Sequence, residues 1–538
     1  MHYFSITNHK YAMSTESDHF LYGEGHLTAG IALKIARGET KGIISQASRK
    51  KIRNSKQVVE NIVEKGHPIY GINTGFGPLC TTKISKEETK ILQSNILQSH
   101  SVGVGDPIAT EIAKLMMILK VQSLSKGYSG IAEETLDRIL WHIDNDVIPI
   151  VPSQGSVGAS GDLAPLSHLF LPLIGLGKVT YQGNTIEVSE LFKTTGLKPL
   201  DLGPKEGLAL INGTQFIAAH AVKVVALLHN CLSQADIIGA MMIEGLQGSV
   251  KPFYKELHQL RPFRGNIHVA SRVKSLLKGS EIMEDHIDCD RVQDPYSLRC
   301  IPQVHGASRN AWLHLKELLE TELNSVTDNP IIINEDLTIS GGSFHGQPLA
   351  MAIDYACLAA SEIGNISDRR IYLALEGNSP GVPKLLMENT GINSGYMILQ
   401  YTTAALASEN KGLCFPSSAD SIPTSLGQED HVSMGSIGGR KALRVIENVE
   451  KILAIELLTA AQAFEFRKPL KSGVILDEIY KEIRTKVSFA EKDRVFADDI
   501  EEGIKIIKNK TIIDIVDTVS QKENLTLETP FSEVFEVY

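Results

Sequence analysis

The chain has 538 residues, of which 43% are hydrophobic and 22% charged, a composition typical of folded proteins, and it is long enough for more than one hydrophobic core. Its formal net charge of −10 argues against nucleic-acid binding, since no basic stripe neutralises phosphates, and we expect small molecules as partners. The six cysteines are scattered without CxxC spacing and the first residues do not resemble a signal peptide, so we expect a cytoplasmic protein without a membrane span.

The sequence predicts three parts. Residues 1–20 are polar and aperiodic, and we expect a loosely held tail. Residues 21–205 predict an N-terminal domain of modest helices and loops, in which the glycine-rich segment Tyr70 to Pro78 interrupts all periodicity and suits a lid. Residues 206–538 predict a bundle of long helices and a C-terminal region.

Four segments of the C-terminal part carry apolar residues at helical spacing: 214–246, 307–326, 348–375 and 441–466. In the first of them the apolar positions nearly encircle the helix, which indicates burial on all sides inside a bundle or oligomer. Strand candidates are brief, at Lys178 to Gly183 and Pro330 to Asn334, and too few for a doubly wound parallel sheet. The predicted fold class is therefore mainly α.

Common catalytic signatures are absent from the sequence, which contains no HExxH, GxxxxGK[ST] or GxGxxG. The nearest candidate for a metal site is HIDCD, from His286 to Asp290. Alternating ligands on such a short polar stretch more often belong to a solvated loop, so we predict no metal site.

The segment GSVGASGDLAPLSHL, from Gly155 to Leu169, contains three glycines in its first seven residues. For an isolated Ala159-Ser160-Gly161 the common interpretation is a glycine loop with Asp162 capping the next helix. The alternative is chemical: if the loop presses the Gly161 nitrogen onto the Ala159 carbonyl, a ring can close, and Ser160 can lose water to become an exocyclic methylene. Only glycine tolerates that backbone approach without strain.

From Tyr70 to Gly473 the chain resembles the histidine and aromatic amino-acid ammonia-lyase family, whose members make a methylidene-imidazolone (MIO) from an Ala-Ser-Gly tripeptide. Besides GASGDLAPLSHL, ordered segments carry the resemblance: YGINTGFGPL (70–79), LQSNILQSHSVGVG (92–105), EGLALINGTQ (206–215), QDPYSLRCIPQVHG (293–306), DNPII (328–332), GGSFHG (341–346), NSGYMILQYTTAAL (393–406), DSIPTSLGQEDHVSMG (420–435) and RKPLKSG (467–473). The resemblance implies the helical ammonia-lyase/fumarase-like fold, MIO formed without an external cofactor, and a homotetramer in which loops from three subunits complete each site.

The resemblance also assigns residues that handle the substrate. Tyr70 matches the base that takes the β-proton, and its alternative role is an aromatic that packs the loop. Arg299 matches the position that holds the substrate carboxylate, a task suited to a planar guanidinium, and its alternative is a surface salt bridge. Tyr296 lies one helical turn before Arg299 and is expected near the amine.

Three further residues match positions around the ring. Asn212 and Gln293 match residues near the ring and its oxygen, and Phe344 matches an aromatic packed beside the ring. Without the resemblance, a buried amide and a core aromatic are the simpler interpretations.

Substrate choice rests on His100 and Glu429. A carboxylate at 429 can accept the N–H of an imidazole, whereas an apolar ring would leave it unpaired; helix capping is its alternative role, and sharing the base function with Tyr70 is another. His100 discriminates less, because some tyrosine lyases are similar there. Ser343 and Gly427 depart from the family, which usually has Asn at both positions.

We therefore predict a carbon–nitrogen lyase that converts L-histidine to trans-urocanate and ammonia, the first step of histidine degradation. Three alternatives stay open: the same chemistry on tyrosine or phenylalanine, an MIO-dependent aminomutase, and a helical assembly protein that keeps the scaffold without making the electrophile.

Overall fold

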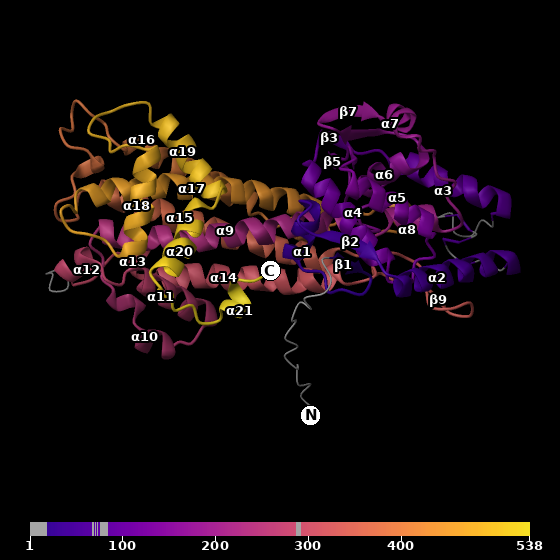
Figure 1. Cartoon of the computed structure of the whole chain (residues 1–538), viewed down its shortest axis with the longest axis horizontal. Coiled ribbons are helices and arrows are strands. Elements are labelled where there is room, and N and C mark those ends of the chain that lie inside the picture. Colours follow the sequence, from indigo (N-terminus) through magenta and orange to yellow (C-terminus); the bar gives the residue numbers. More distant parts are fainter. Residues whose placement is uncertain (1–18, 67–68, 70, 73, 76–83, 287–291) are drawn as a thin grey trace.

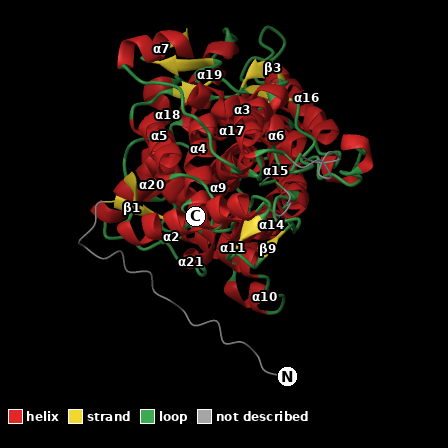
Figure 2. Cartoon of the chain, turned by 90° about the vertical axis from the view of Figure 1, so that its right-hand side faces the viewer, coloured by secondary structure: helices red, strands yellow, loops and turns green. Residues whose placement is uncertain are grey.

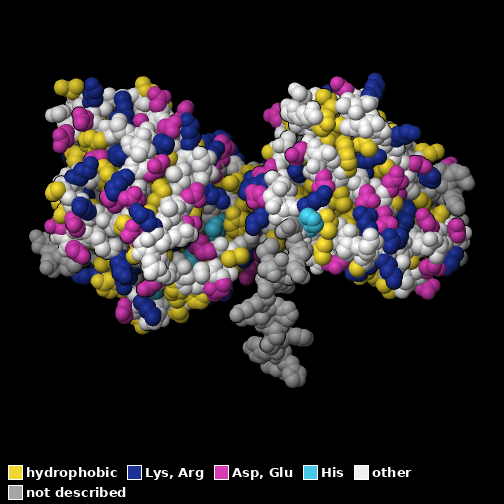
Figure 3. Space-filling model, viewed as in Figure 1, with side chains coloured by type: hydrophobic (Ala, Val, Ile, Leu, Met, Phe, Trp, Pro, Cys, Tyr) yellow, Lys and Arg dark blue, Asp and Glu magenta, His cyan; other side chains and the backbone are white. Residues whose placement is uncertain are grey.

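The computed structural model of the chain describes residues 19–538 except 67–68, 70, 73, 76–83 and 287–291. Long helices run through the middle of the molecule and carry shorter elements at both ends (Figure 1). This architecture confirms the predicted mainly α fold class. On the face shown in Figure 3, acidic and basic side chains are interspersed rather than gathered in a single-sign stripe.

Four long helices form the central bundle: α9 (Gln215–Gly245), α14 (Ile301–Leu323), α15 (Gln347–Leu375) and α17 (Gly435–Glu465). They pack on one another, with α17 against both α9 and α15. Nearly every residue of α9 is buried, as its all-round apolar pattern predicts. Among the described residues α9 alone is long and apolar enough to cross a membrane, and 83% of its apolar window is buried within the structure, as in the core helix of a bundle.

One end of the bundle is covered by the elements that precede α9. Its helices are α1 (Ala29–Ala36), α2 (Gln46–Lys65), α3 (Lys86–His100), α4 (Thr110–Leu124), α5 (Glu133–Asp144), α6 (Leu163–Phe170), η2 (Leu171–Ile174), α7 (Val188–Thr195) and α8 (Glu206–Ile211). Its strands are β1 (His19–Tyr22), β2 (Lys41–Ile44), β3 (Val104–Pro107), β4 (Ile148–Pro149), β5 (Pro152–Gln154), β6 (Lys178–Tyr181) and β7 (Asn184–Glu187).

The remaining elements lie mostly around the other end of the bundle (Figure 1). They are η3 (Lys251–Phe253), α10 (Lys255–Gln259), α11 (Arg264–Leu276), α12 (Glu281–Asp285), α13 (Tyr296–Arg299), η4 (Lys384–Leu386), α16 (Met397–Leu413), η5 (Ser417–Ala419), η6 (Ser425–Gly427), α18 (Val474–Lys486), α19 (Phe496–Lys508), α20 (Thr511–Lys522) and α21 (Ser532–Phe535). The hairpin of β8 (Ile331–Ile332) and β9 (Thr338–Ile339) and the turn η6 return to the end that carries α2 and α3.

The strands form small separate sheets at the margins of the helical body (Figure 2). β1 and β2 pair in parallel, with His19 opposite Lys41, while β3–β5, β4–β6–β7 and β8–β9 are antiparallel. The two predicted strand segments contain β6 and β8, and β1 begins at His19, within the segment predicted as a tail.

One large cluster of buried apolar residues extends from the N-terminal elements into the bundle, including Leu166 of α6, Phe216 of α9 and Leu457 of α17. The N-terminal elements therefore share their core with the long helices. This continuous packing fixes the segment between α5 and α6, which contains Ala159-Ser160-Gly161, against the first turn of α9. The domain boundaries at residues 20 and 205 stay predictions.

Candidate active site

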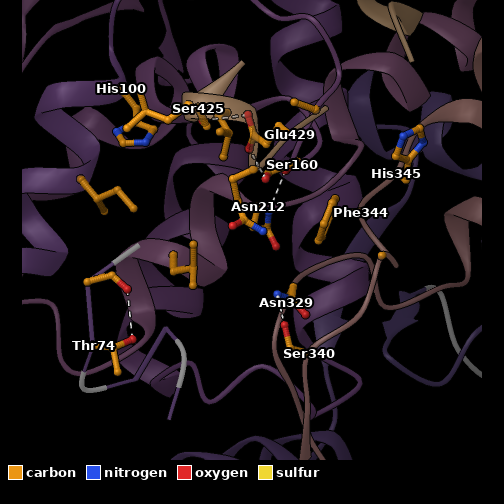
Figure 4. A pocket seen from close by; sticks show the side chains of 18 of the residues that line it. Thr74, His100, Ser160, Asn212, Asn329, Ser340, Phe344, His345, Ser425 and Glu429 are labelled. Atoms are coloured by element: carbon orange, nitrogen blue, oxygen red, sulfur yellow. Dashed lines mark hydrogen bonds between the residues drawn. The ribbon is translucent and has the colours of Figure 1, made fainter. Parts of the chain in front are cut away.

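A cavity of about 1150 Å³ opens where α3, α6 and α8 meet two loops of the C-terminal half. Figure 4 shows its lining side chains, with Ser160 near the centre, Glu429 above it, Asn212 below it and Phe344 to one side. Six of the residues predicted from the sequence line this cavity: His100, Ala159, Ser160, Asn212, Phe344 and Glu429. Residues more than 300 positions apart in the chain thus meet at one place.

The tripeptide forms a tight turn that only glycine fits at its last position. The backbones of Ala159 and Gly161 pair with each other across Ser160, and Gly161 also pairs with Gly213. Gly161 has a φ of 76°, and a Cβ there would lie 2.2 Å from the Gly213 carbonyl oxygen. On the other side of the turn, a Cβ on Gly158 would lie 2.2 Å from Ser433 Oγ. Close contact with the Gly213 backbone on one side and with the Ser433 side chain on the other therefore confines the turn.

The carbonyl oxygen and the hydroxyl of Ser160 are both held by hydrogen bonds. Its carbonyl oxygen accepts from Asn212 Nδ2 at 2.7 Å, and its hydroxyl donates to Glu429 Oε1 at 2.5 Å. Asn212 itself is buried at the end of α8, and within the described part of the chain its Oδ1 has no hydrogen-bond partner. The Asn212 amide and the Glu429 carboxylate thus bracket the serine from opposite sides.

Glu429 is held in place by a short closed loop. The Thr424 N–H donates to the Glu429 carbonyl at 2.9 Å, while the hydroxyls of Thr424 and Ser425 donate to Oε2 at 2.9 and 3.0 Å. Gly427, with a φ of 83°, turns the chain inside this loop. Neither Gly427 nor Ser343, the two departures from the family pattern, is among the residues that line the cavity.

His100 is the last residue of α3 and faces the same cavity. Its Nδ1 lies 2.9 Å from Ser99 Oγ. Burial lowers the pKa of His100, and the Glu429 charge opposes this only in part. The imidazole is therefore neutral near pH 7, and it can accept or donate a hydrogen bond.

Three predicted residues lie elsewhere in the chain. These residues, Gln293, Tyr296 and Arg299, belong to α13 and the segment before it. This segment lies near the C-terminal end of α9, because the N–H of Ser249, just after α9, donates to Asp294 at 2.6 Å. The 31 residues of α9 span about 45 Å at ~1.5 Å per residue, and Figure 1 shows α13 at the end of the molecule opposite α3, α6 and α8, whose residues line the cavity. Tyr296 and Arg299 of the same chain therefore do not reach this cavity, and their assignment to the site stays a prediction that needs a second subunit.

The local geometry of α13 is nevertheless as predicted. Tyr296 and Arg299 stand one helical turn apart, and the guanidinium lies 4.4 Å from the ring centroid. Arg299 Nε donates to the Asp294 carbonyl at 2.9 Å. Tyr296 is 71% exposed, so this pair is presented on the surface of the chain.

Two sequence predictions concern residues outside those that the structure describes. Tyr70, the predicted base, lies outside the described residues, although Thr74 and Gly75 of the same glycine-rich segment line the cavity. Most of the HIDCD segment, from Ile287 onward, also lies outside them. Over the described ranges, no group of three or more metal-ligating side chains is present.

Sequence reasoning missed two buried charges behind the site. Asp162 is the N-cap residue of α6, but its side chain makes no capping hydrogen bond; its carboxylate instead accepts from the Ile217 N–H of α9 at 3.0 Å and from Ser156 Oγ at 3.1 Å. Burial raises the pKa of Asp162 to about 7. Lys120 is equally buried on α4, and its signal in the sequence is a lone lysine inside the apolar run LMMILKVQ.

Residues 27–485 match the family model for aromatic amino acid lyases. The chain belongs to the aromatic amino acid lyase family. This lyase is 43% identical to the histidine ammonia-lyase of Caldanaerobacter subterraneus subsp. tengcongensis over 504 residues, which cover 94% of the chain and 98% of the relative. Among solved structures it is similar to histidine ammonia-lyase from Trypanosoma cruzi, with a TM-score of 0.87, 37% identity and coverage of 97% and 98%.

A tyrosine aminomutase from Streptomyces globisporus has the same fold, with a TM-score of 0.88 and 33% identity over 93% of this lyase and 98% of the aminomutase. The backbone fold alone therefore does not separate substrates or reaction outcomes within the family. Sequence identity favours the histidine ammonia-lyases, at 43% and 37% against 33% for the aminomutase.

Proposed function

We propose that this chain is a histidine ammonia-lyase, a carbon–nitrogen lyase that converts L-histidine to trans-urocanate and ammonia in the cytoplasm as the first step of histidine degradation. The observation that carries the proposal is the Glu429 carboxylate 2.5 Å from the Ser160 hydroxyl, in a cavity that also contains His100. A carboxylate and an imidazole at the reacting centre suit a polar heterocycle better than a phenyl ring.

The tight turn of the tripeptide supports MIO formation. The backbones of Ala159 and Gly161 pair across Ser160, and the Gly161 nitrogen can bond to the Ala159 carbonyl carbon with release of one water. Ser160 releases the second water from its Cα–H and Cβ–OH. The finished group supplies an electrophilic methylene to which the substrate amine adds, so that ammonia leaves more easily, and it needs no external cofactor.

Glu429 is arranged to recognise the substrate ring. Ser160 loses its hydroxyl during maturation, which frees Oε1 of Glu429, while the Thr424 and Ser425 hydroxyls keep hold of Oε2. The free oxygen can accept the imidazole N–H of histidine. A phenyl ring would leave it unpaired at a cost of about 1–3 kcal/mol.

The other cavity residues position or surround the reacting atoms. Asn212 holds the Ser160 carbonyl oxygen, and Phe344 covers one side of the tripeptide (Figure 4). His100 is placed to contact the imidazole of the substrate. We assign the base that takes the β-proton to Tyr70, whose phenol needs a pKa lowered by neighbouring positive charge or hydrogen bonds.

We further propose that Gln293, Tyr296 and Arg299 reach the cavity from another copy of the chain in a homotetramer. Within one chain the length of α9, about 45 Å, lies between them and the Ser160 end of the bundle, whereas the surface exposure of Tyr296 leaves this segment available to a neighbour. Arg299 then binds the substrate carboxylate with two parallel donors, Tyr296 lies near the amine, and Gln293 completes the hydrogen bonding around the ring.

Two measurements test the proposal. A peptide that contains residues 159–161 should be lighter than its sequence by two waters, and an unmodified mass would contradict the lyase assignment. Separate incubation with histidine, tyrosine and phenylalanine, followed by the ultraviolet absorbance of each conjugated acid, should give urocanate from histidine alone. Cinnamate, coumarate or a β-amino acid as the main product would instead support the tyrosine, phenylalanine or aminomutase alternative.

A further inference from the structure

Lys120 is a fully buried lysine on α4 that the reaction described above does not use. Its Nζ donates to the carbonyl oxygen of Ala209 at 3.1 Å and to that of Asn212 at 2.6 Å. Burial lowers the pKa of Lys120 to about 7. Burial of an amine costs free energy unless hydrogen bonds compensate it, so the two acceptors show what this lysine holds in place.

Both acceptors belong to the C-terminal end of α8. Asn212 is the residue that follows the last helical position, and its side chain donates to the Ser160 carbonyl oxygen at 2.7 Å. Positive charge is favourable beside the free carbonyls of a helix end. The Lys120 amine is therefore only one residue removed from Ser160: it binds the Asn212 main chain, and the Asn212 side chain binds the serine.

The chain turns sharply just after Asn212, and a second buried charge fixes the far side of the turn. The carbonyl of Gly213 accepts from the Asp162 N–H at 2.8 Å, and the Asp162 carboxylate accepts from the Ile217 N–H at the start of α9. Gly213 has a φ of 135°, and a Cβ there would lie 3.2 Å from Lys120 Nζ. Hydrogen bonds from Lys120 on one side and Asp162 on the other thus fix the turn that carries the Asn212 amide.

A second buried lysine nearby has different partners. Lys205 Nζ donates to Asp328 at 2.7 Å and to the Ser129 carbonyl at 3.0 Å, and neither acceptor belongs to the turn. Lys205 is as buried as Lys120, and the charges of Lys205, Asp328 and Asp162 all act on Lys120. Lys205 therefore provides a matched comparison for the removal of a buried amine.

We propose that Lys120 is a positioning residue, which fixes the Asn212 amide on the Ser160 carbonyl oxygen and so promotes the loss of water from Ser160. In that step Ser160 gives up its Cα proton and its Cβ hydroxyl as one water while the Cα=Cβ bond forms, without oxidation or reduction. Negative charge develops on the Ser160 carbonyl oxygen as the Cα proton leaves. The amide donor stabilises that charge only if Asn212 is held at the correct distance.

The test follows maturation itself and does not need a substrate. The wild-type chain, Lys120→Met, Lys205→Met, Asn212→Ala and the Lys120→Met/Asn212→Ala double variant are made in a cell-free system, and the mass of the peptide with residues 159–161 is followed over time. We expect Lys120→Met to slow the loss of the second water about 10–100-fold, so that a species lighter by one water accumulates. Lys205→Met should mature at the wild-type rate.

The double variant shows whether Lys120 acts through Asn212. Once Asn212 is replaced by alanine, Lys120→Met should change the maturation rate by less than about 3-fold, because the group that it positions is gone. Three results would each overturn the proposal. Lys120→Met could slow maturation equally in the wild-type and Asn212→Ala chains, Lys205→Met could slow it as much as Lys120→Met does, or Lys120→Met could mature at the wild-type rate. Urea midpoints of all variants show which of them are folded.

The proposal rests on the MIO assignment but not on the choice of substrate. If the wild-type chain matures and makes no urocanate, the proposed substrate is wrong, and the maturation rates still decide the role of Lys120. If the wild-type chain keeps its full mass, both proposals are wrong.

Discussion

Replacement of Gly161 by alanine gives a quantitative test of the tight turn. The φ of 76° costs a residue with a Cβ about 1–2 kcal/mol. The new Cβ would also lie 2.2 Å from the Gly213 carbonyl oxygen, and relief of such a backbone clash costs about 1–3 kcal/mol more. Gly161→Ala should therefore lose about 2–5 kcal/mol of stability in total, and it should not mature, since the turn must open.

Gly38 supplies the control for this prediction. It has a φ of 74°, and a Cβ there would meet no heavy atom within 4 Å. Gly38→Ala should lose only the conformational part, about 1–2 kcal/mol, and mature normally. Urea unfolding at a fixed protein concentration measures the difference, and peptide mass measures maturation. A Gly161→Ala chain that loses two waters and unfolds at the same urea concentration as Gly38→Ala would refute the reasoning.

Three other predictions follow from contacts in the structure. Glu429→Gln should lower histidine turnover about 10–100-fold, since the charge that faces the imidazole is lost, with an unchanged urea midpoint; comparable turnover would contradict the role of Glu429. Ser160→Ala and Arg299→Ala should each be inactive alone, yet co-expression should restore activity, because hybrids of the proposed tetramer would contain sites with both residues intact; no recovery would contradict shared sites. Burial lowers the pKa of His220 to about 4, so its contribution to stability is complete above pH 6.5 and is lost as the pH falls toward 4. Between pH 6.5 and 4, the free energy of unfolding of His220→Gln should therefore fall by about 3 kcal/mol less than that of the wild type. Urea unfolding at each pH measures this, and an equal fall in both proteins would contradict it.

Much of the fold follows from local sequence patterns. The apolar segment 214–246 coincides with α9 (Gln215–Gly245), and 441–466 covers most of α17. Such helices are readable because burial repeats with the helical period, and an all-round pattern means burial on every side. Short strands are also found where β-branched residues lie between turns, as at Lys178 to Gly183.

The arrangement of the site was only partly predictable. Sequence spacing places Tyr296 and Arg299 on one helical turn, and the structure confirms this, but spacing contains no information on their distance from Ser160. Nor does it show which polar groups lie behind the tripeptide. Asp162 looks like a helix cap in the sequence because it precedes α6, yet its carboxylate binds the start of α9, a contact between segments that only the tertiary fold brings together.

The turn at Ala159-Ser160-Gly161 is closed by groups from distant parts of the chain: the Gly213 carbonyl before α9, the Glu429 carboxylate and the Ser433 side chain before α17. A chain still being synthesised lacks the last two of these groups when the tripeptide leaves the ribosome. We therefore expect the ring to close only after the bundle has assembled. The loss of mass from this peptide is then a permanent record that the chain has folded. In a pulse-labelled cell, the ratio of the dehydrated peptide to the unmodified peptide would report what share of the molecules had ever reached the native state, even after they unfold again.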